Sequence, residues 1–486
     1  MKVLDKDFET RLYIDGAYRS AKLGGTFDVI NPSTGAVIAK VDAATAEDVD
    51  LAVQAAHRQF ETGEWSQTNG AERGRLLNRL ADLLERDADF LAHLECLDNG
   101  KTVGSARMAD VANTIATFRY FAGWADKLEG RTIPTPDPVG RKTLSYTVRE
   151  PLGVIGAISA YNCPTMYVGW KAAPALAAGN TVVLKPPEEA PLTTLYIAQL
   201  FAEAGFPPGV FNVISGLGPV AGTALVKHPL VAKVSFTGGG RVGRLIAHDA
   251  AEMLKPITLE LGGKAPQIVL EDADLATAIP ALALGVFANQ GQICAAGTRI
   301  VVHRSIQKTV AEGLADLAKS QKVGDPFDPG TTMGPMTTAA GARRVSEYVE
   351  KGKAEGAKLL AGGQRIPGNG YFVNPAIFMG TNQHSIAQEE IFGPVATIIP
   401  FDSHDEAVQI ANDTPYGLNA GLFTRDLSHA NLLSRKLRTG AVWINGWGLV
   451  DPRLPWGGIK ASGYGRENGA NGLEDVTHEK VITIVL

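Results

Sequence analysis

Cysteine carries the strongest intrinsic chemistry of the residue types in this chain, because its thiolate is both a nucleophile and a metal ligand. The chain has three cysteines, Cys96, Cys163 and Cys294, which lie far apart in the sequence. Their number and spacing do not form a disulfide framework, and no Cys-x-x-Cys or His-Glu-x-x-His pattern offers a metal site. We therefore expect no bound metal, and each cysteine is either a small core residue or a nucleophile that its neighbours activate.

A glycine-rich segment offers a second kind of chemistry, the binding of a pyrophosphate. The apolar run 231–236 leads into the residues TGGGRVG at 237–243, where Gly238, Gly240 and Gly243 fit the pattern G-x-G-x-x-G. Between a strand and a helix, such glycines let a pyrophosphate approach the positive N-terminus of the helix. The same glycines could instead serve only close packing, so the pattern by itself leaves both interpretations open.

Short apolar runs separated by helical stretches predict the elements that would position these residues. The runs lie at residues 153–158, 181–184, 231–236 and 267–270, with helices expected at 192–204 and 243–254. Nearly continuous apolar runs alternating with helices are typical of βαβ units and a parallel sheet. A second series begins near Glu260 and runs past Ala396. The predicted fold class is therefore α/β, with two parallel-sheet domains.

Four further segments have a recognisable periodicity. Residues 48–60 and 73–97 have the spacing of amphipathic helices, and residues 142–149 alternate polar and apolar side chains like a strand with one face in water. Residues 479–486 form a terminal apolar strand. Because an unpaired strand edge readily accepts another strand, we expect this terminal strand to pair with another chain.

The composition restricts the classes of function. The chain has 486 residues, 45% hydrophobic and 20% charged, with a net charge of −5, which suits two or three ordinary globular domains. No basic block indicates a nucleic-acid partner, and no apolar stretch reaches the ~18 residues of a membrane span. Residues 1–7 are charged and lack an apolar segment, so we expect no secretory signal and a cytoplasmic location.

Seven motifs in a fixed order make the chain similar to a known family. They are Asn162-Cys163-Pro164, Lys185-Pro186-Pro187-Glu188, Leu259-Glu260-Leu261-Gly262-Gly263-Lys264, Asn289-Gln290-Gly291-Gln292-Ile293-Cys294, Glu389-Glu390-Ile391-Phe392-Gly393-Pro394, Pro455-Trp456-Gly457-Gly458 and Ser462-Gly463-Tyr464-Gly465-Arg466-Glu467. With these motifs the chain resembles the aldehyde dehydrogenase superfamily, in its hydrolytic branch that does not use coenzyme A. The resemblance extends from Asn31-Pro32 to the terminal strand.

The resemblance implies a division of the chain into three parts. Residues 1–128 and 151–259 would form a Rossmann-like NAD-binding domain, and residues 260–467 a catalytic domain. Residues 129–150 and 468–486 would form a small β element for oligomerisation. The resemblance therefore also implies a homodimer or a homotetramer.

The resemblance assigns catalytic roles to five residues. Cys294 matches the nucleophile that attacks the aldehyde, and Asn162 matches a donor to the resulting oxyanion, with the backbone N–H of Cys294 as the second donor. Glu260 matches the base that activates water to hydrolyse a thioester. Its distance from the glycine-rich segment would also suit a ribose ligand, but the match to the family favours the base. Lys171 and Glu467 match a proton route, or else form a surface salt bridge.

The resemblance also implies the cofactor and its ligands. They are Lys185, Glu188, Thr237, Gly238, Gly239, Gly243, Glu390 and Phe392. Lys185 and Glu188 would hold the adenosine ribose, and Glu390 and Phe392 would lie at the nicotinamide ribose and ring. A carboxylate at Glu188 suits the free 2′-hydroxyl of NAD and would repel the 2′-phosphate of NADP, so NAD is expected ahead of NADP. The family often has serine where this chain has Gly239.

The substrate site implied by the resemblance is apolar and aromatic. It would be lined by Cys163, Met166, Tyr167, Trp170, Ile293, Ala295, Trp447, Val450 and Trp456. This set favours an aliphatic or aromatic aldehyde. A quaternary-ammonium aldehyde, bound on aromatic faces, and a semialdehyde, bound through Arg453, are the alternatives.

Two rival functions belong to other classes. In an enzyme that acylates coenzyme A, the thiol of that cofactor replaces water, and the presence of Glu260 argues against this. A non-enzymatic relative would keep only the fold, which the intact set of Cys294, Asn162 and Glu260 opposes.

Overall fold

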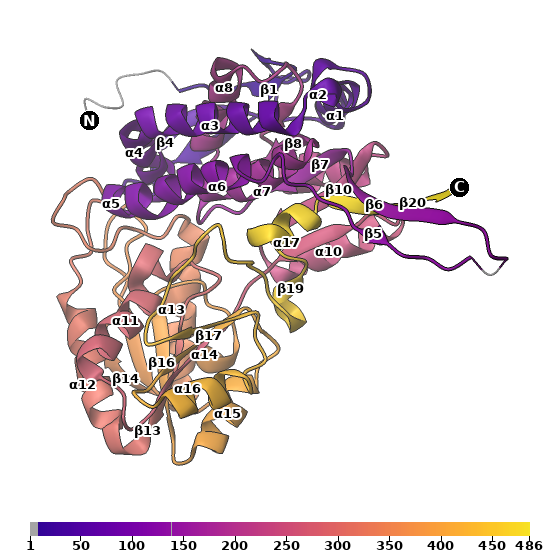
Figure 1. Cartoon of the computed structure of the whole chain (residues 1–486). Coiled ribbons are helices and arrows are strands. Elements are labelled where there is room, and N and C mark those ends of the chain that lie inside the picture. Colours follow the sequence, from indigo (N-terminus) through magenta and orange to yellow (C-terminus); the bar gives the residue numbers. More distant parts are fainter. Residues whose placement is uncertain (1–7, 138) are drawn as a thin grey trace.

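The computed structural model describes residues 8–137 and 139–486, whose strands form two large sheets, a three-stranded sheet and a two-stranded ribbon (Figure 1). The ribbon pairs β3 (Thr26–Ile30) with β4 (Val37–Asp42). Residues 1–7, on which the expectation about a secretory signal depends, lie outside the described residues. Within the described residues, no helix combines the length and apolar character needed to cross a membrane.

The first large sheet has a parallel centre made of the predicted apolar runs. Its parallel strands are β7 (Val154–Ile158), β8 (Thr181–Lys185), β9 (Phe211–Val213), β10 (Val231–Thr237) and β11 (Ile257–Glu260). Their order in space is β11-β10-β7-β8-β9, and antiparallel strands β1 (Leu12–Ile14), β2 (Ala17–Arg19) and β19 (Gly463–Tyr464) extend the edges. The chain order reverses direction between β7 and β10, which marks a topological switch point where such sheets bind ligands.

The second large sheet is likewise mainly parallel. Its order is β14-β15-β16-β13-β12-β17-β18, in which only β14 runs antiparallel to its neighbour among the described strands. The strands are β12 (Pro266–Val269), β13 (Arg299–His303), β14 (Lys358–Ala361), β15 (Ala376–Met379), β16 (Val395–Phe401), β17 (Asn419–Phe423) and β18 (Ala441–Ile444). Two parallel sheets with helices confirm the predicted α/β fold class.

Helices cover the sheets and bury the apolar side chains between the layers (Figure 1). Those of the first sheet are α1 (Ala46–Glu61), α2 (Glu64–Gln67), α3 (Gly70–Arg86), α4 (Ala88–Asn99), α5 (Val103–Ser105), α6 (Ala112–Ala122), α7 (Pro164–Ala178), α8 (Leu192–Ala204), α9 (Thr223–Lys227) and α10 (Gly240–Ala251). Those of the second sheet are α11 (Leu275–Phe287), α12 (Gln307–Ser320), α13 (Ala339–Ala354), α14 (Ser385–Gln388), α15 (His404–Asn412) and α16 (Leu427–Ser434). Short α17 (Gly469–Glu474) precedes the terminal strand.

Two predicted helices differ from the structure. The single helix expected over residues 73–97 is wrong, because Asp87 (φ −99°, ψ 13°) leaves helical geometry and separates α3 from α4. The helix expected from residue 243 begins earlier, at Gly240, because the glycine-rich segment itself forms the first turn of α10.

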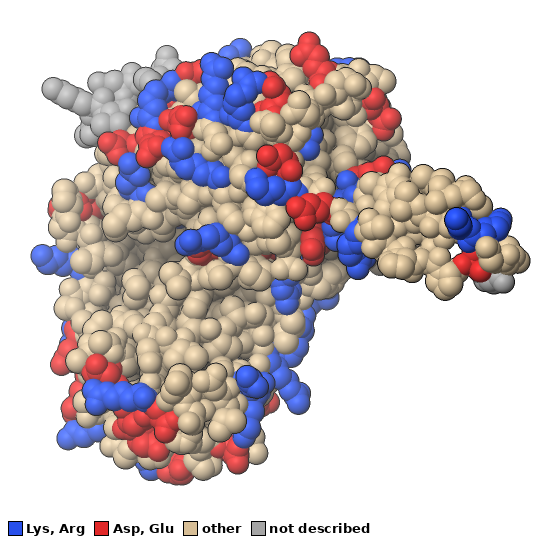
Figure 2. All heavy atoms as spheres, in the orientation of Figure 1, with Lys and Arg blue, Asp and Glu red and all other residues tan. Residues whose placement is uncertain are grey.

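The terminal strand belongs to an arm that projects from the body of the molecule (Figures 1 and 2). β20 (Thr477–Val485) pairs antiparallel with β6 (Thr143–Pro151), which pairs in turn with β5 (Thr132–Ile133). One edge of β20 therefore pairs within its own chain, with β6. Pairing of its outer edge with another chain stays a prediction.

Candidate active site

A cavity of about 600 Å³ lies where the two large sheets meet. Its wall is made of segments that follow β7, β8, β10 and β11 of the first sheet and of segments that precede β13 and β16 of the second. The carboxyl ends of one sheet thus meet the amino ends of the other, at the switch point between β7 and β10. Asn162, Glu260 and Cys294, which are far apart in sequence, line this one cavity.

Cys294 lies in a tight loop between α11 and β13. Three consecutive residues of that loop have left-handed backbone conformations, Asn289 (φ 47°), Gln290 (φ 57°) and Gly291 (φ 70°). Strain of this kind persists only where the surrounding structure holds it in place, and it clusters at functional sites. Cys294 is half-buried, and burial raises the pKa of its thiol to about 12. The environment of this thiol thus favours its protonated form.

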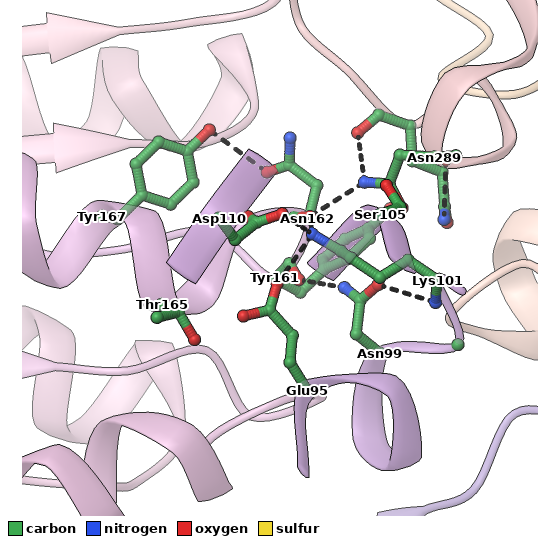
Figure 3. A network of polar contacts seen from close by, with 12 residues as sticks. Glu95, Asn99, Lys101, Ser105, Asp110, Tyr161, Asn162, Thr165, Tyr167 and Asn289 are labelled. Carbon is green, nitrogen blue, oxygen red and sulfur yellow. Dashed lines mark hydrogen bonds and ion pairs between the residues drawn. The ribbon is translucent and has the colours of Figure 1, made fainter. Parts of the chain in front are cut away.

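Asn162 follows β7 and is buried. Its side-chain oxygen accepts a hydrogen bond from the Tyr167 hydroxyl at 3.3 Å, which leaves its amide nitrogen to donate elsewhere (Figure 3). Its backbone carbonyl is held separately, by Asn289 Nδ2 at 2.8 Å and by Lys101 Nζ at 2.8 Å. The amide is thus fixed both at its backbone and at its side chain, as an oxyanion donor must be.

Glu260 ends β11 as a buried carboxylate, and neither of its oxygens has a hydrogen-bond partner among the described residues. Burial raises the pKa of Glu260 well above its ordinary value, and the carboxylate of Glu467 raises it further. A buried carboxylate without partners is costly for a fold, so a role in stability does not explain it. Such a group is suited to accept and release a proton.

Lys171 and Glu467 form a buried ion pair, with 2.7 Å between Nζ and Oε1. Ser235 accepts from Lys171 at 3.0 Å and donates to Glu467 at 2.9 Å, which closes a three-membered network. The surface salt bridge considered for this pair is therefore wrong. Both charged groups of this network influence the pKa of Glu260: the Glu467 carboxylate raises it and the Lys171 ammonium lowers it.

The segment after β8 supplies a carboxylate to the far end of the cavity. Lys185 and Glu188 both line it, with 3.4 Å between the Lys185 ammonium and a Glu188 oxygen. The other Glu188 oxygen accepts from the backbone N–H of Gly218 at 2.5 Å. Burial lowers the pKa of Lys185. The structure thus brings together the two residues predicted to hold a ribose.

The glycine-rich turn between β10 and α10 forms another part of the wall. The Thr237 hydroxyl is buried without a hydrogen-bond partner among the described residues, so it has a free donor for a ligand. A side chain at Gly239 would meet nothing within 4 Å, whereas one at Gly243 would lie 2.6 Å from Leu261 Cδ2. Gly239 therefore leaves open space over the helix N-terminus, and Gly243 lets the helix pack closely. Gly243 is thus a packing residue behind the cavity wall.

Glu390 and Phe392 approach the cavity from the segment before β16. Glu390 accepts from the backbone N–H of Gly263 at 3.1 Å, and burial raises the pKa of Glu390 to about 7. The Phe392 ring meets Tyr161 edge-on, with 5.8 Å between the ring centroids. Tyr161, Arg241 and Arg344 also line the cavity, and no motif in the sequence pointed to them.

Most residues predicted to line the substrate site form one apolar cluster around Cys294. Its predicted members are Cys163, Met166, Tyr167, Trp170, Ile293, Ala295, Val450 and Trp456. Trp447 joins it through a hydrogen bond from its indole N–H to the Ala295 carbonyl, at 3.1 Å. The prediction missed Trp443 and Leu418; the spacing of Trp443 from Trp447, four residues, was the available signal.

The aromatic rings of this cluster pack against one another, with one stacked pair and the others tilted or edge-on. Trp443 lies nearly parallel to Trp456, with 5.9 Å between the ring centroids, and Trp456 lies 6.2 Å from Trp170. The Trp170 indole N–H donates to Asn113 Oδ1 at 2.7 Å, so its polar atom is satisfied and its faces are left for apolar contact. These rings make a wide apolar wall beside the thiol.

Three residues considered in the sequence have local explanations. Arg453 is exposed and forms an ion pair with Asp451 at 2.6 Å. Burial raises the pKa of the Cys163 thiol well above its ordinary value, and Cys96 is buried within α4, so both thiols stay protonated.

Within residues 8–137 and 139–486, no three His, Cys, Asp or Glu side chains come together as a metal site. On the face that Figure 2 shows, basic and acidic side chains are interspersed rather than gathered in one patch.

These features define a class of protein: a two-sheet α/β enzyme with a glycine-rich strand-to-helix turn and a cysteine in one cavity. The model of the aldehyde dehydrogenase family matches residues 18–482. An aldehyde dehydrogenase of Emericella nidulans is 47% identical over 473 residues, which cover 97% of this chain and 94% of that protein. The chain therefore belongs to the aldehyde dehydrogenase family, as its motifs predicted.

Solved structures of the family match the whole fold. The NAD⁺ complex of an aldehyde dehydrogenase from Bacillus cereus has a TM-score of 0.97 at 44% identity, covering 100% of this chain and 98% of that one. A betaine aldehyde dehydrogenase from Staphylococcus aureus in complex with NAD⁺ has a TM-score of 0.96 at 40% identity, covering 99% and 96%. This chain is thus similar both to a protein named aldehyde dehydrogenase and to one named betaine aldehyde dehydrogenase.

Proposed function

We propose that this enzyme oxidises an apolar aldehyde to a carboxylate, with NAD as hydride acceptor and water as the source of the second oxygen. The observation that carries this proposal is the unpartnered carboxylate of Glu260 in the cavity that also holds Cys294 and Asn162. A carboxylate is needed to activate water and is not needed when a thiol cofactor accepts the acyl group. The proposal therefore favours hydrolysis.

The first half-reaction uses Cys294 and Asn162. The Cys294 sulfur attacks the aldehyde carbon, its proton passes to a base in the cavity, and the carbonyl π electrons move to oxygen. The Asn162 amide and the backbone N–H of Cys294 donate to that oxyanion. NAD, when bound, accepts the hydride that leaves the tetrahedral carbon, and a thioester on Cys294 remains.

The second half-reaction uses Glu260. Its carboxylate takes a proton from water, the water oxygen bonds to the thioester carbon, and the carbon–sulfur bond breaks to release the carboxylic acid. Lys171 and Glu467 would pass the proton on; the support for this role is that they form a buried polar network whose charges act on Glu260. The sulfur of Cys294 regains a proton and the cycle closes.

The residues around the cavity fit a dinucleotide. The Thr237 hydroxyl lacks a partner, the backbone over Gly239 is open, and Glu188 presents a carboxylate for a ribose hydroxyl. Glu390 and Phe392 line the same cavity from the segment before β16 of the second sheet, and they would meet the nicotinamide end. The carboxylate of Glu188 favours NAD over NADP, and the two structures described above contain NAD⁺. This assignment follows the predicted domain boundaries, with residues 151–259 binding the cofactor.

The aromatic wall supports an aliphatic or aromatic aldehyde as the substrate. The wall is built of apolar and aromatic side chains, and Arg453 is engaged in an ion pair with Asp451. The one arginine considered as a counter-ion for a carboxylate-bearing semialdehyde is therefore already paired. The projecting arm supports the further proposal of a homodimer or homotetramer, with the outer edge of β20 at the interface.

One experiment separates this function from its rivals. The enzyme is incubated with NAD, a panel of aldehydes and ¹⁸O-labelled water, with and without coenzyme A. We expect equal amounts of NADH and singly labelled carboxylate without coenzyme A, and the highest kcat/KM for aliphatic or aromatic aldehydes. Turnover that requires coenzyme A, or no NAD reduction with any aldehyde, would contradict the proposal, and a preference for quaternary-ammonium or semialdehyde substrates would contradict its substrate part.

A further inference from the structure

A short segment at the end of α4 connects the two loops that carry the candidate catalytic residues. Asn99, Gly100 and Lys101 lie between α4 and the π-helical turn η2 (Ala106–Val111). Lys101 reaches the loop of Asn162, and the carbonyl of Gly100 reaches the loop of Cys294. None of the seven motifs includes this segment, and the mechanism above does not use it.

Lys101 is the centre of a buried charged cluster. Its ammonium lies 2.7 Å from Glu95 of α4 and 2.8 Å from Asp110 of η2, and all three side chains are almost fully buried. The same ammonium donates to the backbone carbonyl of Asn162 at 2.8 Å. Figure 3 shows Glu95, Asp110 and Asn162 grouped around this one nitrogen. A fixed ammonium in such a dry environment makes a strong, charge-assisted bond to that carbonyl.

The preceding peptide is held by the same segment. Asn99 Nδ2 donates to the Tyr161 carbonyl at 2.6 Å. Two successive carbonyls, those of Tyr161 and Asn162, are therefore anchored to residues 99–101 (Figure 3). Because both peptide groups are fixed, the Asn162 side chain has little freedom to turn away from the cavity.

The loop of Cys294 is anchored from the other side of the segment. Gln290 Nε2 donates to the Gly100 carbonyl at 3.1 Å, and the Thr337 hydroxyl donates to the Asn99 carbonyl at 2.7 Å while it accepts from Gln292 at 3.2 Å. These bonds hold the left-handed residues that precede Cys294. Asn289 links the two loops directly through its bond to the Asn162 carbonyl.

We propose that residues 99–101 are a positioning element, with Lys101 as its central residue, that sets the Asn162 amide relative to the sulfur of Cys294. The proposal rests on the proposed function, in which Asn162 donates to the oxyanion formed at Cys294. Misplacement of a donor by about 1 Å can cost on the order of 10²-fold in rate. Residues from both loops bond to this one segment, so a displacement of either loop strains the same set of bonds.

The ion pairs of Lys101 explain why a charged residue is suited to this buried position. A buried ion pair adds little net stability compared with apolar residues of the same size, but it fixes geometry, because leaving one partner unpaired is costly. Of the atoms around the ammonium, two are carboxylate oxygens and one is the Asn162 carbonyl. The carboxylates thus hold the ammonium where it must be in order to hold that carbonyl.

The test is a mutant cycle with Asn162. The variant E95Q/K101M/D110N removes the ammonium without leaving a buried charge unpaired, and we expect the pre-steady-state rate of NADH formation to fall by about 10²-fold, as for a misplaced donor. The Kd for NADH and the rate of Cys294 alkylation by iodoacetamide should change less than about twofold, because neither needs an oxyanion donor. In an N162A background the triple substitution should add less than about twofold, because the effect passes through Asn162.

Two single substitutions, one test and one control, examine the proposal if the triple variant does not fold. Asn289→Gly removes the second donor to the Asn162 carbonyl at a position whose φ of 47° glycine adopts freely, and we expect about a tenfold loss, again absent in N162A, for one lost hydrogen bond. Arg73→Met is the matched control, since Arg73 also donates to backbone carbonyls, those of Ala177 and Thr68, but outside the cavity. It should leave the rate of NADH formation unchanged.

Four outcomes would decide against the proposal or its basis. A triple variant with the unaltered rate, or losses that multiply fully with that of N162A, would overturn the role of Lys101. An N162A enzyme with the unaltered rate would instead overturn the proposed function itself. A loss in Arg73→Met equal to that in Asn289→Gly would show that the rate follows general stability.

Discussion

Two groups of buried carboxylates near the cavity differ in one respect, which is whether they have partners. Glu467 is paired with Lys171 and Ser235, and Glu95 and Asp110 share Lys101. Both oxygens of Glu95 and of Glu260 lack hydrogen bonds among the described residues, but Glu95 has the Lys101 ammonium at 2.7 Å, whereas Glu260 has no ion-pair partner there. Buried charged groups are normally paired, so the ion-paired carboxylates contribute to the structure, and we propose that the unpaired Glu260 takes part in the chemistry.

The largest effect on aldehyde oxidation is expected when the proposed nucleophile, Cys294, is replaced. Cys294→Ala should abolish aldehyde oxidation, because Cys294 lines the cavity and the other two cysteines, Cys96 and Cys163, do not. NADH should bind with unchanged affinity, as measured by fluorescence titration. Residual steady-state oxidation by the variant, or loss of NADH binding alone, would contradict the role of Cys294.

A second prediction contrasts the paired and the unpaired carboxylate through stability. Lys171→Met leaves Glu467 buried without its counter-charge, which costs about 3–5 kcal/mol, whereas Glu260→Gln removes a buried charge that has no partner and should leave stability equal or higher. Denaturant unfolding measures both. Equal destabilisation by the two substitutions would remove the distinction on which the comparison depends.

The pH dependence of thioester hydrolysis is a further test of the role proposed for the unpaired Glu260 carboxylate. Burial and the charge of Glu467 raise the pKa of Glu260, and only the ionised carboxylate accepts a proton from water. The hydrolysis rate should therefore rise with pH through a value well above 4.5, the ordinary value for glutamate. Glu260→Gln should lack this limb in its residual hydrolysis rate. If the hydrolysis rate of the variant still rises with pH in the same range, a group other than Glu260 causes that rise.

The smallest effect concerns the cofactor turn. Gly239→Ser places its side chain in open space at the N-cap of α10, and we expect the Kd for NADH to fall by about 2–10-fold, for one added hydrogen bond of about 0.5–1.5 kcal/mol. Gly243→Ser serves as the opposite case, because its Cβ would lie 2.6 Å from Leu261 Cδ2. Stronger binding by the Gly243 variant than by the Gly239 variant would contradict the geometry described for this turn.

The sequence predicted the parts of this molecule that depend on local pattern. The apolar runs became β7, β8, β10 and β12, and five of the seven motifs led to cavity-lining residues, because these five lie at or near the ends of β7, β8, β11, β13 and β16. The break at Asp87 was not predicted, because residues 73–97 keep helical spacing across it.

The interactions between distant segments could not be read from the sequence. The burial of Lys171 and Glu467 depends on how α7 packs beside the C-terminal segment, and spacing alone allowed a surface pair. The cluster of Lys101 joins residues 95–110 to Asn162 through tertiary contacts, and no local pattern marks a lysine that bonds a carbonyl 61 positions away. Leu418 was missed for the same reason.

The central claim is that Glu260 activates the water that releases the product from Cys294. The most direct measurement is rapid mixing of Glu260→Gln with NAD and a reactive aldehyde, followed by mass spectrometry of the intact protein. We predict one equivalent of NADH formed, no second turnover on the time scale of that burst, and a mass increase equal to the acyl group on Cys294. Steady-state turnover at the normal rate, or no acyl adduct after the burst of NADH, would contradict the account.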